Sequence, residues 1–175
     1  KGESIKNEIK KLVNEHDIFK LTEPLRFNKD TEAFIRKVFK MRQQSGNPQK
    51  ANIDIIKIHN ENEAYKYSEY LQKNYGYVLL KPLSTESITK KYNYDDHGFN
   101  VIGKEFENII VILDERYFYD DTKGLQISGE KNTYSGSHNL LKLNYEIFTR
   151  VKNKITILIV GNDELYENIV KIKNA

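Results

Sequence analysis

Two nearly uninterrupted apolar segments constrain the fold of this chain more than any other feature of its sequence. They are 108–113 (NIIVIL) and 155–160 (ITILIV). A strand with one face in water alternates between apolar and polar residues, whereas a strand buried on both faces is apolar throughout. We therefore expect both segments to be central strands of a parallel sheet that carries helices on its two faces.

Weaker patterns predict the elements around these two strands. Further strands are expected at 53–58, which is rich in β-branched residues, and at 77–80, which Pro82 ends. Helices are expected at 4–14, at 31–41 with Asp30 as N-cap, after Asn60 with Glu63 completing a capping box, at 137–152, and after Asn162. An extended stretch is expected at 19–25 and polar loops at 42–52 and 120–137, the second long enough to be functional or mobile. The alternation of strands and helices predicts an α/β fold with a mostly parallel sheet flanked by helices.

Composition excludes several classes of protein. The 175 residues correspond to one domain, and the absence of cysteine fits a reducing compartment such as the cytoplasm. No apolar run approaches the roughly 20 residues that span a bilayer, so we expect no membrane partner. The net charge of +3 is too small to indicate nucleic-acid binding on its own. Because the chain begins at Lys1, without an initiator methionine or a signal-like stretch, we expect it to be a piece of a longer protein.

A self-sufficient catalytic centre is also missing from the sequence. The chain holds neither a G-x-x-x-x-G-K-[ST] phosphate loop nor a G-x-G-x-x-G dinucleotide fingerprint. Without cysteine there is no thiolate nucleophile or zinc knuckle, and the four histidines stand at spacings that suit no metal site. The 28 basic residues include only five arginines, so each arginine in this lysine-rich chain invites a specific explanation: Arg26, Arg36, Arg42, Arg116 and Arg150.

Three segments go beyond this background. In 101–113 (VIGKEFENIIVIL), Gly103 permits close backbone approach to a ligand, and Glu105 can accept hydrogen bonds from sugar hydroxyls. In 144–151 (NYEIFTRV), Arg150 lies on a predicted helix that an apolar strand follows. In 21–28 (LTEPLRFN), Arg26 stands ahead of another predicted helix.

These three segments resemble, in order and spacing, motifs of the C-terminal motor half of superfamily 1 helicases. GKEFENIIVIL resembles motif V, NYEIFTRV resembles motif VI, and LTEPLRFN resembles motif IV. The pairing of VIGKEF with a later FTR is similar, more narrowly, to the Schlafen-group-3-like branch of bacterial DNA/RNA helicase-type ATPases. The resemblance covers about residues 19–172 and implies a RecA-like three-layer domain, the second of the two in such a motor.

The resemblance also implies what the residues do. In that family ATP with Mg²⁺ lies in a cleft between two RecA-like domains, and the N-terminal domain of the same chain supplies the phosphate loop and the magnesium-binding acid. This half would supply Arg150 and Arg26 to the γ-phosphate and Glu105 to the ribose, with Gly103 and Thr149 beside them. A planar, permanently charged guanidinium stabilises the charge on the transferred phosphoryl group. Because half of the site is absent, we expect this chain alone to be inactive as an ATP hydrolase.

One departure from the family pattern concerns nucleic acid. The T-x-H-x-S-Q stretch that usually precedes the motif V glycine is replaced here by 97–102 (HGFNVI). Most polar groups that would contact a strand are therefore replaced, so strand contact and unwinding are implied less firmly than nucleotide sensing. His97, together with Ser84 and Thr85 at the expected carboxyl end of a strand, are the candidates for contact with DNA or RNA.

Ordinary structural roles remain open for the same residues. Arg150 could form a surface ion pair, Glu105 could be a turn carboxylate, and Thr149 could cap its turn locally. Tyr145 is expected to face the core, and the tyrosines at 65, 67 and 70 are expected to serve helix packing rather than base stacking. For the whole chain, the alternatives are a non-catalytic regulatory or interaction module with a degenerate helicase fold, and an unrelated α/β enzyme with its site in loops such as 120–137.

Overall fold

A computed structural model describes residues 28–42, 45–81, 96–97, 101, 103–128 and 140–175. The helix expected at 4–14 and the extended stretch expected at 19–25 lie outside these residues. Within the described part, no helix is long and apolar enough to cross a membrane.

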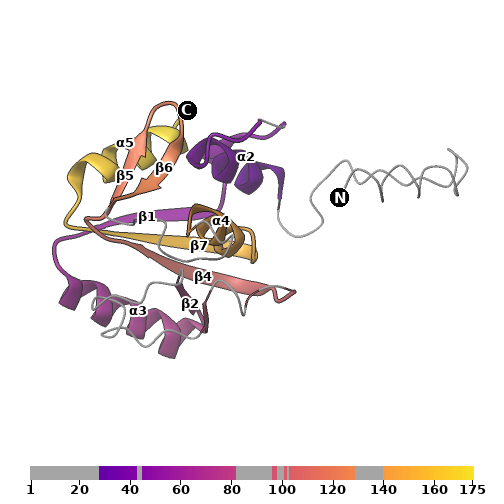
Figure 1. Ribbon diagram of the computed structural model, residues 1–175. Helices are drawn as coiled ribbons and strands as arrows, with labels where there is room; N and C mark the ends of the chain where they lie inside the picture. The colour runs from indigo at the N-terminus through magenta and orange to yellow at the C-terminus, as the bar shows by residue number, and fades with distance from the viewer. Residues whose placement is uncertain (1–27, 43–44, 82–95, 98–100, 102, 129–139) are drawn as a thin grey trace, which may run out of the picture.

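The centre of the molecule is a five-stranded sheet with the strand order β1-β7-β4-β2-β3 (Figure 1). Its strands are β1 (Ile53–Ile58), β2 (Val78–Lys81), β3 (Asp96–His97), β4 (Phe106–Leu113) and β7 (Val151–Val160). Every neighbouring pair runs parallel. The two apolar segments of the sequence form β4 and β7, which lie side by side in the interior of the sheet, so the prediction of a parallel sheet is confirmed.

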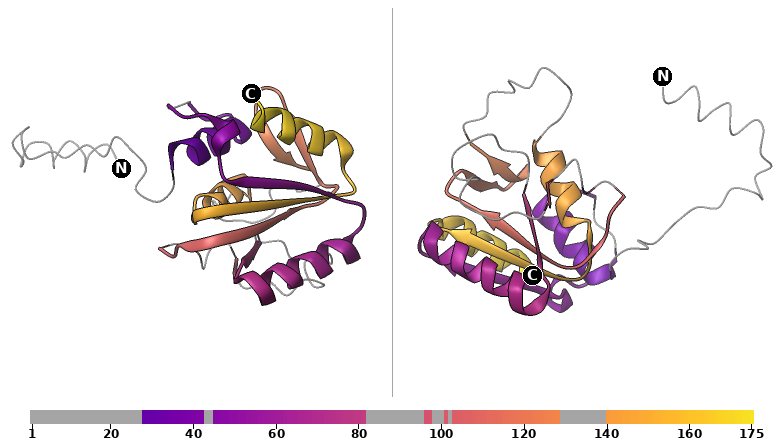
Figure 2. Two further views of the ribbon diagram at one scale, coloured as in Figure 1. Left: turned by 180° about the vertical axis from the view of Figure 1, so that it is seen from behind. Right: turned by 90° about the horizontal axis from the view of Figure 1, so that it is seen from below.

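Helices cover both faces of this sheet, as the two further views in Figure 2 show. One face carries α3 (Glu61–Tyr75). The other face carries α2 (Lys29–Val38), α4 (Leu140–Phe148), α5 (Asp163–Lys173) and a hairpin of β5 (Tyr117–Asp120) and β6 (Gly124–Ile127). A short 3₁₀ turn, η2 (Pro48–Lys50), precedes β1. The molecule is therefore the three-layer α/β structure that the alternation of elements predicts.

The side chains of β4 show why its sequence is apolar throughout. Ile109, Val111 and Leu113 are buried in the core that α2, α4 and α5 share with the sheet. Ile110 and Ile112 are buried in a second core, under α3. Successive residues of a strand point to opposite faces, so both faces of β4 must be apolar when both are covered.

Asparagine side chains cap the N-termini of α2, α3 and α5. The side chain of Asn60 accepts the backbone N–H of Glu63 at 3.1 Å, as the predicted capping box requires. The Glu63 carboxylate accepts the N–H of His59 at 3.2 Å, one residue before the N–H that a capping box uses, so the reciprocal half of the box differs from the prediction. Asn162 begins α5 in the same way, as predicted. Residues that accept a backbone N–H through a short side chain are the ones that helix N-termini favour.

The start of α2 differs from the prediction. Asn28, not Asp30, is its N-cap, because the Asn28 side chain accepts the N–H of Thr31 at 2.7 Å. Asp30 lies inside the first turn and accepts the N–H of Asn47 at 2.7 Å. The acidic residue thus connects the helix to the loop before β1 instead of capping the helix.

Two further predictions are wrong at their boundaries. The helix expected at 137–152 ends at Phe148, and β7 begins at Val151, because 151–154 pair with the exposed start of β4 and need no apolar side chains there. The loop expected at 120–137 contains the β5–β6 hairpin up to residue 127, with Gly124 at φ +80° in its turn. Residues 129–137 of that stretch lie outside the described residues.

Candidate functional site

The structure describes four of the eight predicted site residues with their side chains. These are Gly103, Glu105, Thr149 and Arg150. Arg26, Ser84 and Thr85 lie outside the described residues, and of His97 only its backbone place in β3 is known. The geometry below therefore concerns the segments that resemble motifs V and VI.

These two segments meet at one edge of the sheet. Glu105 directly precedes β4 and Arg150 directly precedes β7, and the two strands are parallel neighbours. The backbone N–H of Phe106 donates to the carbonyl of Arg150 at 2.9 Å. Residues that stand 44 positions apart in the sequence are thus joined at the amino ends of β4 and β7, which we call the amino edge.

A chain of asparagine side chains crosses this amino edge. Asn52, before β1, donates to the side chain of Asn153 at 3.1 Å, and Asn153 donates to Asn108 of β4 at 3.0 Å. The register between β4 and β7 shifts here by one residue, between the Phe106–Val151 pair and the Asn108–Lys154 pair. Register shifts of this kind redirect side chains and are frequent beside functional sites.

Gly103 takes part in the turn that leads into β4. The N–H of Lys104 donates to the carbonyl of Val101 at 3.0 Å, and Gly103 has φ +83°, a conformation that glycine adopts without strain. A Cβ atom at Gly103 would meet no described atom within 4 Å. The backbone conformation, rather than a crowded surrounding, is what requires glycine here, and the open space leaves its backbone accessible.

Thr149 stabilises the turn between α4 and β7. Its hydroxyl donates to the carbonyl of Glu146 at 2.9 Å, while its N–H donates to the carbonyl of Tyr145 at 3.1 Å. The N–H of Arg150 donates to the carbonyl of Ile147 at 3.1 Å and closes the turn. These contacts are local, so Thr149 acts in this structure as a cap that orients the residue after it.

Arg150 is almost completely buried and only partly satisfied. Just 5% of the residue is exposed, and its guanidinium donates to the carboxylate of Glu146 on the last turn of α4. Its Nε atom is buried and has no hydrogen-bond partner within the described residues. A buried donor without an acceptor costs about 1–3 kcal/mol, so an acceptor supplied from elsewhere would stabilise this arginine.

Glu105 is far more accessible than Arg150. Its carboxylate lies 3.4 Å from the ammonium of Lys152 on β7, and the two side chains are 36% and 45% exposed. An exposed ion pair of this length contributes little stability and exchanges readily with other partners. The carboxylate is therefore exposed enough to meet a ligand at the amino edge.

Most of the tyrosines that were expected to pack in the interior or against a helix do so. Tyr145 packs edge to face against Phe39, with ring centroids 5.6 Å apart, and burial raises the pKa of its hydroxyl. Tyr65 and Tyr67 pack against the core under α3. Tyr70 differs, because it is 50% exposed and contacts the ring of Tyr75 at 5.5 Å.

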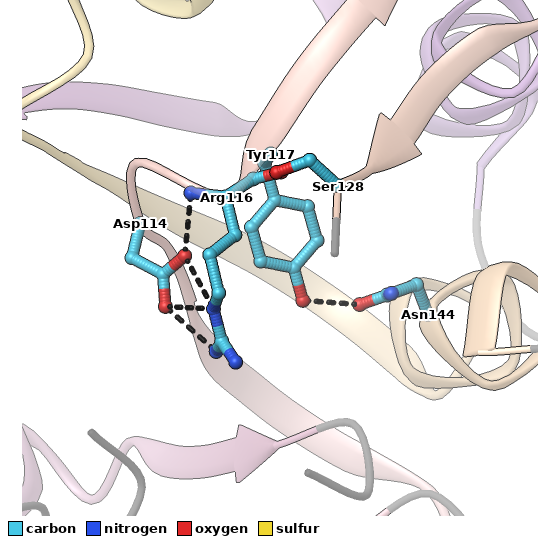
Figure 3. Close-up of polar contacts among 5 residues, drawn as sticks. All are labelled: Asp114, Arg116, Tyr117, Ser128 and Asn144. Carbon is cyan, nitrogen blue, oxygen red and sulfur yellow. Dashed lines mark hydrogen bonds and ion pairs between the residues drawn. The ribbon is translucent and has the colours of Figure 1, made fainter. Parts of the chain in front are cut away.

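A second arginine site, which the sequence analysis left without a role, lies where β4 ends (Figure 3). The guanidinium of Arg116 donates to both oxygens of the buried Asp114, at 2.8 and 3.1 Å, and the Arg116 N–H donates to the same carboxylate at 3.0 Å. Nearby, the Tyr117 hydroxyl donates to the side chain of Asn144 at 3.3 Å. An arginine two residues after an aspartate, directly behind an apolar strand, is the sequence signal that points to this turn.

Most of the described arginines have a carboxylate of their own segment as partner. Arg36 pairs with Glu32 at 2.7 Å, Arg116 with Asp114, and Arg150 with Glu146. The guanidinium fork suits such short-range pairing better than an ammonium does. The scarcity of arginine in this chain therefore does not single out Arg150, and what distinguishes it is its unpartnered Nε.

Comparison with known proteins adds little. No protein-family model matches the chain, and no curated protein matches it either. Among solved structures, the chain is similar to the C-terminal domain of a possible DNA helicase from Lactobacillus plantarum WCFS1, with 13% sequence identity and a TM-score of 0.46. That likeness covers 84% of this chain and 97% of the other. At this identity and TM-score it carries no weight for function.

Proposed function

We propose that this chain is the second, RecA-like motor domain of a superfamily 1 helicase-like ATPase, similar to the Schlafen-group-3-like branch. Its amino edge would complete an ATP site shared with an N-terminal RecA-like domain of the same protein. One observation carries the proposal: the segments that resemble motifs V and VI meet at the starts of adjacent strands, where Phe106 and Arg150 are hydrogen-bonded.

The chemistry of the amino edge fits a nucleoside triphosphate. Arg150 would place its guanidinium against the γ-phosphate, where charge develops during phosphoryl transfer, and Glu105 would accept hydrogen bonds from the ribose hydroxyls. The buried, unpartnered Nε of Arg150 is the observation that favours an external acceptor. As in the family that the chain resembles, Mg²⁺ would be held by the N-terminal domain.

Glu146 would hold Arg150 in a resting state before nucleotide binds. In the structure its carboxylate is paired with the Arg150 guanidinium, the group that would bind phosphate. Arg150 must exchange this partner for the γ-phosphate when the two domains close on the nucleotide. Hydrolysis would therefore depend on domain closure, because the stabilising arginine is engaged elsewhere until then.

The remaining parts of the proposal concern residues that the structure does not describe with side chains. Arg26 would be the second arginine at the γ-phosphate, and α2 begins three residues after it. Ser84, Thr85 and His97 would contact DNA or RNA, and the intact protein would act in the cytoplasm. Hydrolase and strand-binding activity belong to the intact protein, not to this chain alone.

A second candidate function is a non-catalytic regulatory or interaction module that keeps a degenerate helicase fold. The observation that favours it is the burial of Arg150, of which 5% is exposed and which already has a carboxylate partner. In that case the Glu146–Arg150 pair is a structural contact and no nucleotide reaches it. The two candidates differ in whether the intact protein hydrolyses ATP in an Arg150-dependent manner.

Steady-state ATPase measurements on the intact protein test the proposal. Arg150→Ala and Arg150→Lys should lower kcat by roughly 10³-fold, as the loss of an arginine finger does, with KM for ATP nearly unchanged. Arg42→Ala is the matched control, because Arg42 is an exposed arginine away from the amino edge. An unchanged kcat in both Arg150 variants removes Arg150 from catalysis, and an intact protein without ATPase activity supports the non-catalytic module.

A further inference from the structure

A hollow with a strongly basic lining lies outside the amino edge. It has a volume of about 350 Å³ and is formed where the last turns of α2 and α5 approach strand β5, three elements that Figure 1 shows side by side. We call it the basic hollow and define it by Arg36, Lys37, Lys40, Tyr119, Asp121 and Lys171. None of the amino-edge residues lines it.

Charge is the first sign that this hollow takes an anion. Four cationic side chains line it, and Asp121 supplies a carboxylate. Two of the cations already have partners, since the Arg36 guanidinium donates to Glu32 and the Lys37 ammonium donates to a carbonyl oxygen of Ala175. Lys40 and Lys171 are exposed at its rim, whereas Arg36 and Lys37 are half-buried. Lys171 has no ion pair or hydrogen bond with the described residues. Lys40 and Lys171 thus bring two exposed positive charges to the hollow, and a bound anion would relieve the repulsion between them.

The backbone at Lys40 is the second, independent sign. Lys40 has φ +50°, in the left-handed region, and its N–H donates to the carbonyl of Lys37 at 3.2 Å while Met41 donates to Arg36 at 2.9 Å. This is the helix ending at which glycine is usual. A non-glycine residue there costs roughly 1–2 kcal/mol, yet the chain places a lysine, with its ammonium 5.6 Å from the centre of the Tyr119 ring.

Contacts of the hairpin hold the hollow in shape. The Tyr119 hydroxyl donates to the carbonyl of Lys37 at 3.2 Å. A Cβ atom at Gly124 would stand 2.4 Å from the carbonyl oxygen of Val38, so the hairpin backbone presses directly on the end of α2. The Tyr119 ring and the backbone at the end of α2 are therefore held relative to one another before any ligand arrives, which lowers the cost of binding.

Apolar surface beside the cations further restricts the class of ligand that fits the hollow. The Tyr119 ring is half-buried in the wall of the hollow, and Met41 is 39% exposed at its rim. A ligand that is only an anion, such as inorganic phosphate, would leave this surface in water. A phosphate attached to a flat or apolar group would contact both parts, since aromatic side chains stack on nucleobases.

We propose that the basic hollow binds a nucleotide unit, with its phosphate between Lys40 and Lys171 and its base or sugar against Tyr119. The unit has two possible sources, a free nucleotide or the backbone of a single strand. The site is separate from the amino edge and does not depend on the ATP site proposed there. A volume of about 350 Å³ suits one small ligand.

Titration of the ¹⁵N-labelled chain with adenosine monophosphate, and with a fluorescein-labelled oligodeoxythymidine of 12 nucleotides in anisotropy measurements, tests the proposal. The amides of Lys40, Met41 and Tyr119 should shift on titration. Lys171→Glu should weaken binding at 0.1 M salt by about fivefold or more, because each phosphate contact contributes a factor of this size for single strands. Saturation by the monophosphate identifies a free nucleotide as the source, and binding of the oligonucleotide alone identifies a strand.

Two variants separate lost binding from lost folding. Lys40→Gly removes the ammonium but places glycine where the backbone favours it, so thermal unfolding should be unchanged or higher while binding weakens. Lys66→Glu, an exposed lysine of α3 on the opposite face of the sheet, makes the same change in net charge as Lys171→Glu and should bind as wild type. Equal binding by all variants, equal loss in Lys66→Glu, or equal displacement by polyglutamate would each overturn the proposal.

Discussion

An arginine paired with a carboxylate lies beside each end of the central strand β4, but the two arginines differ in how fully they are hydrogen-bonded. At its carboxyl end, Arg116 holds the buried Asp114 through the guanidinium and the backbone N–H (Figure 3). At its amino end, Arg150 holds Glu146 but keeps a buried Nε without a partner in the described residues. The first arginine is satisfied within its own turn, whereas the second is left with an unused donor.

This difference separates a structural arginine from a candidate functional one better than burial does. Both ion pairs are mostly hidden from water, with side chains 19% and 10% exposed at Arg116–Asp114 and 6% and 28% exposed at Arg150–Glu146. Folding alone favours complete satisfaction of buried polar groups. A buried donor without a partner among the described residues is therefore available to an acceptor beyond them, and the predictions below test that interpretation.

The largest effect on stability is expected at the carboxyl end of β4. Arg116→Ala leaves the Asp114 carboxylate buried without its cation, which costs about 3 kcal/mol, and should lower Tm by about 6–12 °C. Urea denaturation and thermal melts of this chain measure the loss. Arg42→Ala serves as the exposed control, and a variant as stable as that control would show that Arg116 is dispensable.

A smaller loss of stability is expected from Arg150→Ala in this chain. Glu146 is 28% exposed and can be hydrated once its partner is gone, and the substitution also removes an unsatisfied donor. The free energy of unfolding should fall by about 1 kcal/mol. If Arg150→Ala were as damaging as Arg116→Ala, the two ends of β4 would be alike, and the amino edge would be structural.

Glu146→Gln sharpens the comparison further, because it keeps the shape of the side chain and removes only its charge. The stability of this chain should change by less than about 1 kcal/mol. In the intact protein, weaker retention of Arg150 should raise the basal ATPase rate by about two- to fivefold. A rate that falls or stays equal would show that Glu146 does not compete with the nucleotide for this arginine.

The Lys154–Asp54 ion pair, at 2.7 Å between β7 and β1, shows how much an ordinary ion pair contributes to the stability of this chain. Its hydrogen bond to Asp54 raises the pKa of Lys154. A raised lysine pKa contributes stability that is complete below the unfolded value near 10.5 and is lost as pH rises through the folded value. The Tm difference between wild type and Lys154→Met, followed from pH 8 to 12, should therefore shrink toward the alkaline end. A constant difference would show that Lys154 stabilises by packing alone.

The sequence predicted the interior of the sheet better than its borders, and the reason is physical. The runs 108–113 and 155–160 are apolar because helices cover both faces, so they report burial. They do not report strand length, since β7 begins at the buried Val151 and continues through the polar 152–154, where Lys152 and Asn153 are exposed. The hairpin was missed for the same reason: Phe118 and Gln126 face away from the core, and the pattern of such short strands resembles a loop.

The candidate site shows the same division. That Glu105 and Arg150 meet at one edge follows from parallel pairing of the two strands they precede, which the sequence indicates. The Glu146–Arg150 pair could also have been predicted, since residues four apart share a helix face. The basic hollow could not, because it depends on how the ends of α2, α5 and β5 approach one another, and no local pattern in the sequence specifies that approach.

The one-residue register shift between β4 and β7 has a consequence for how this chain tolerates change. Because side chains alternate along a strand, the extra residue beside Asn153 determines which way everything before it points, including Arg150. Deleting a single residue there would restore even pairing and rotate the guanidinium to the opposite side. Substitutions along 151–154 should thus be tolerated far better than insertions or deletions there. The number of residues in this stretch, more than their chemical type, sets the direction in which the Arg150 side chain points.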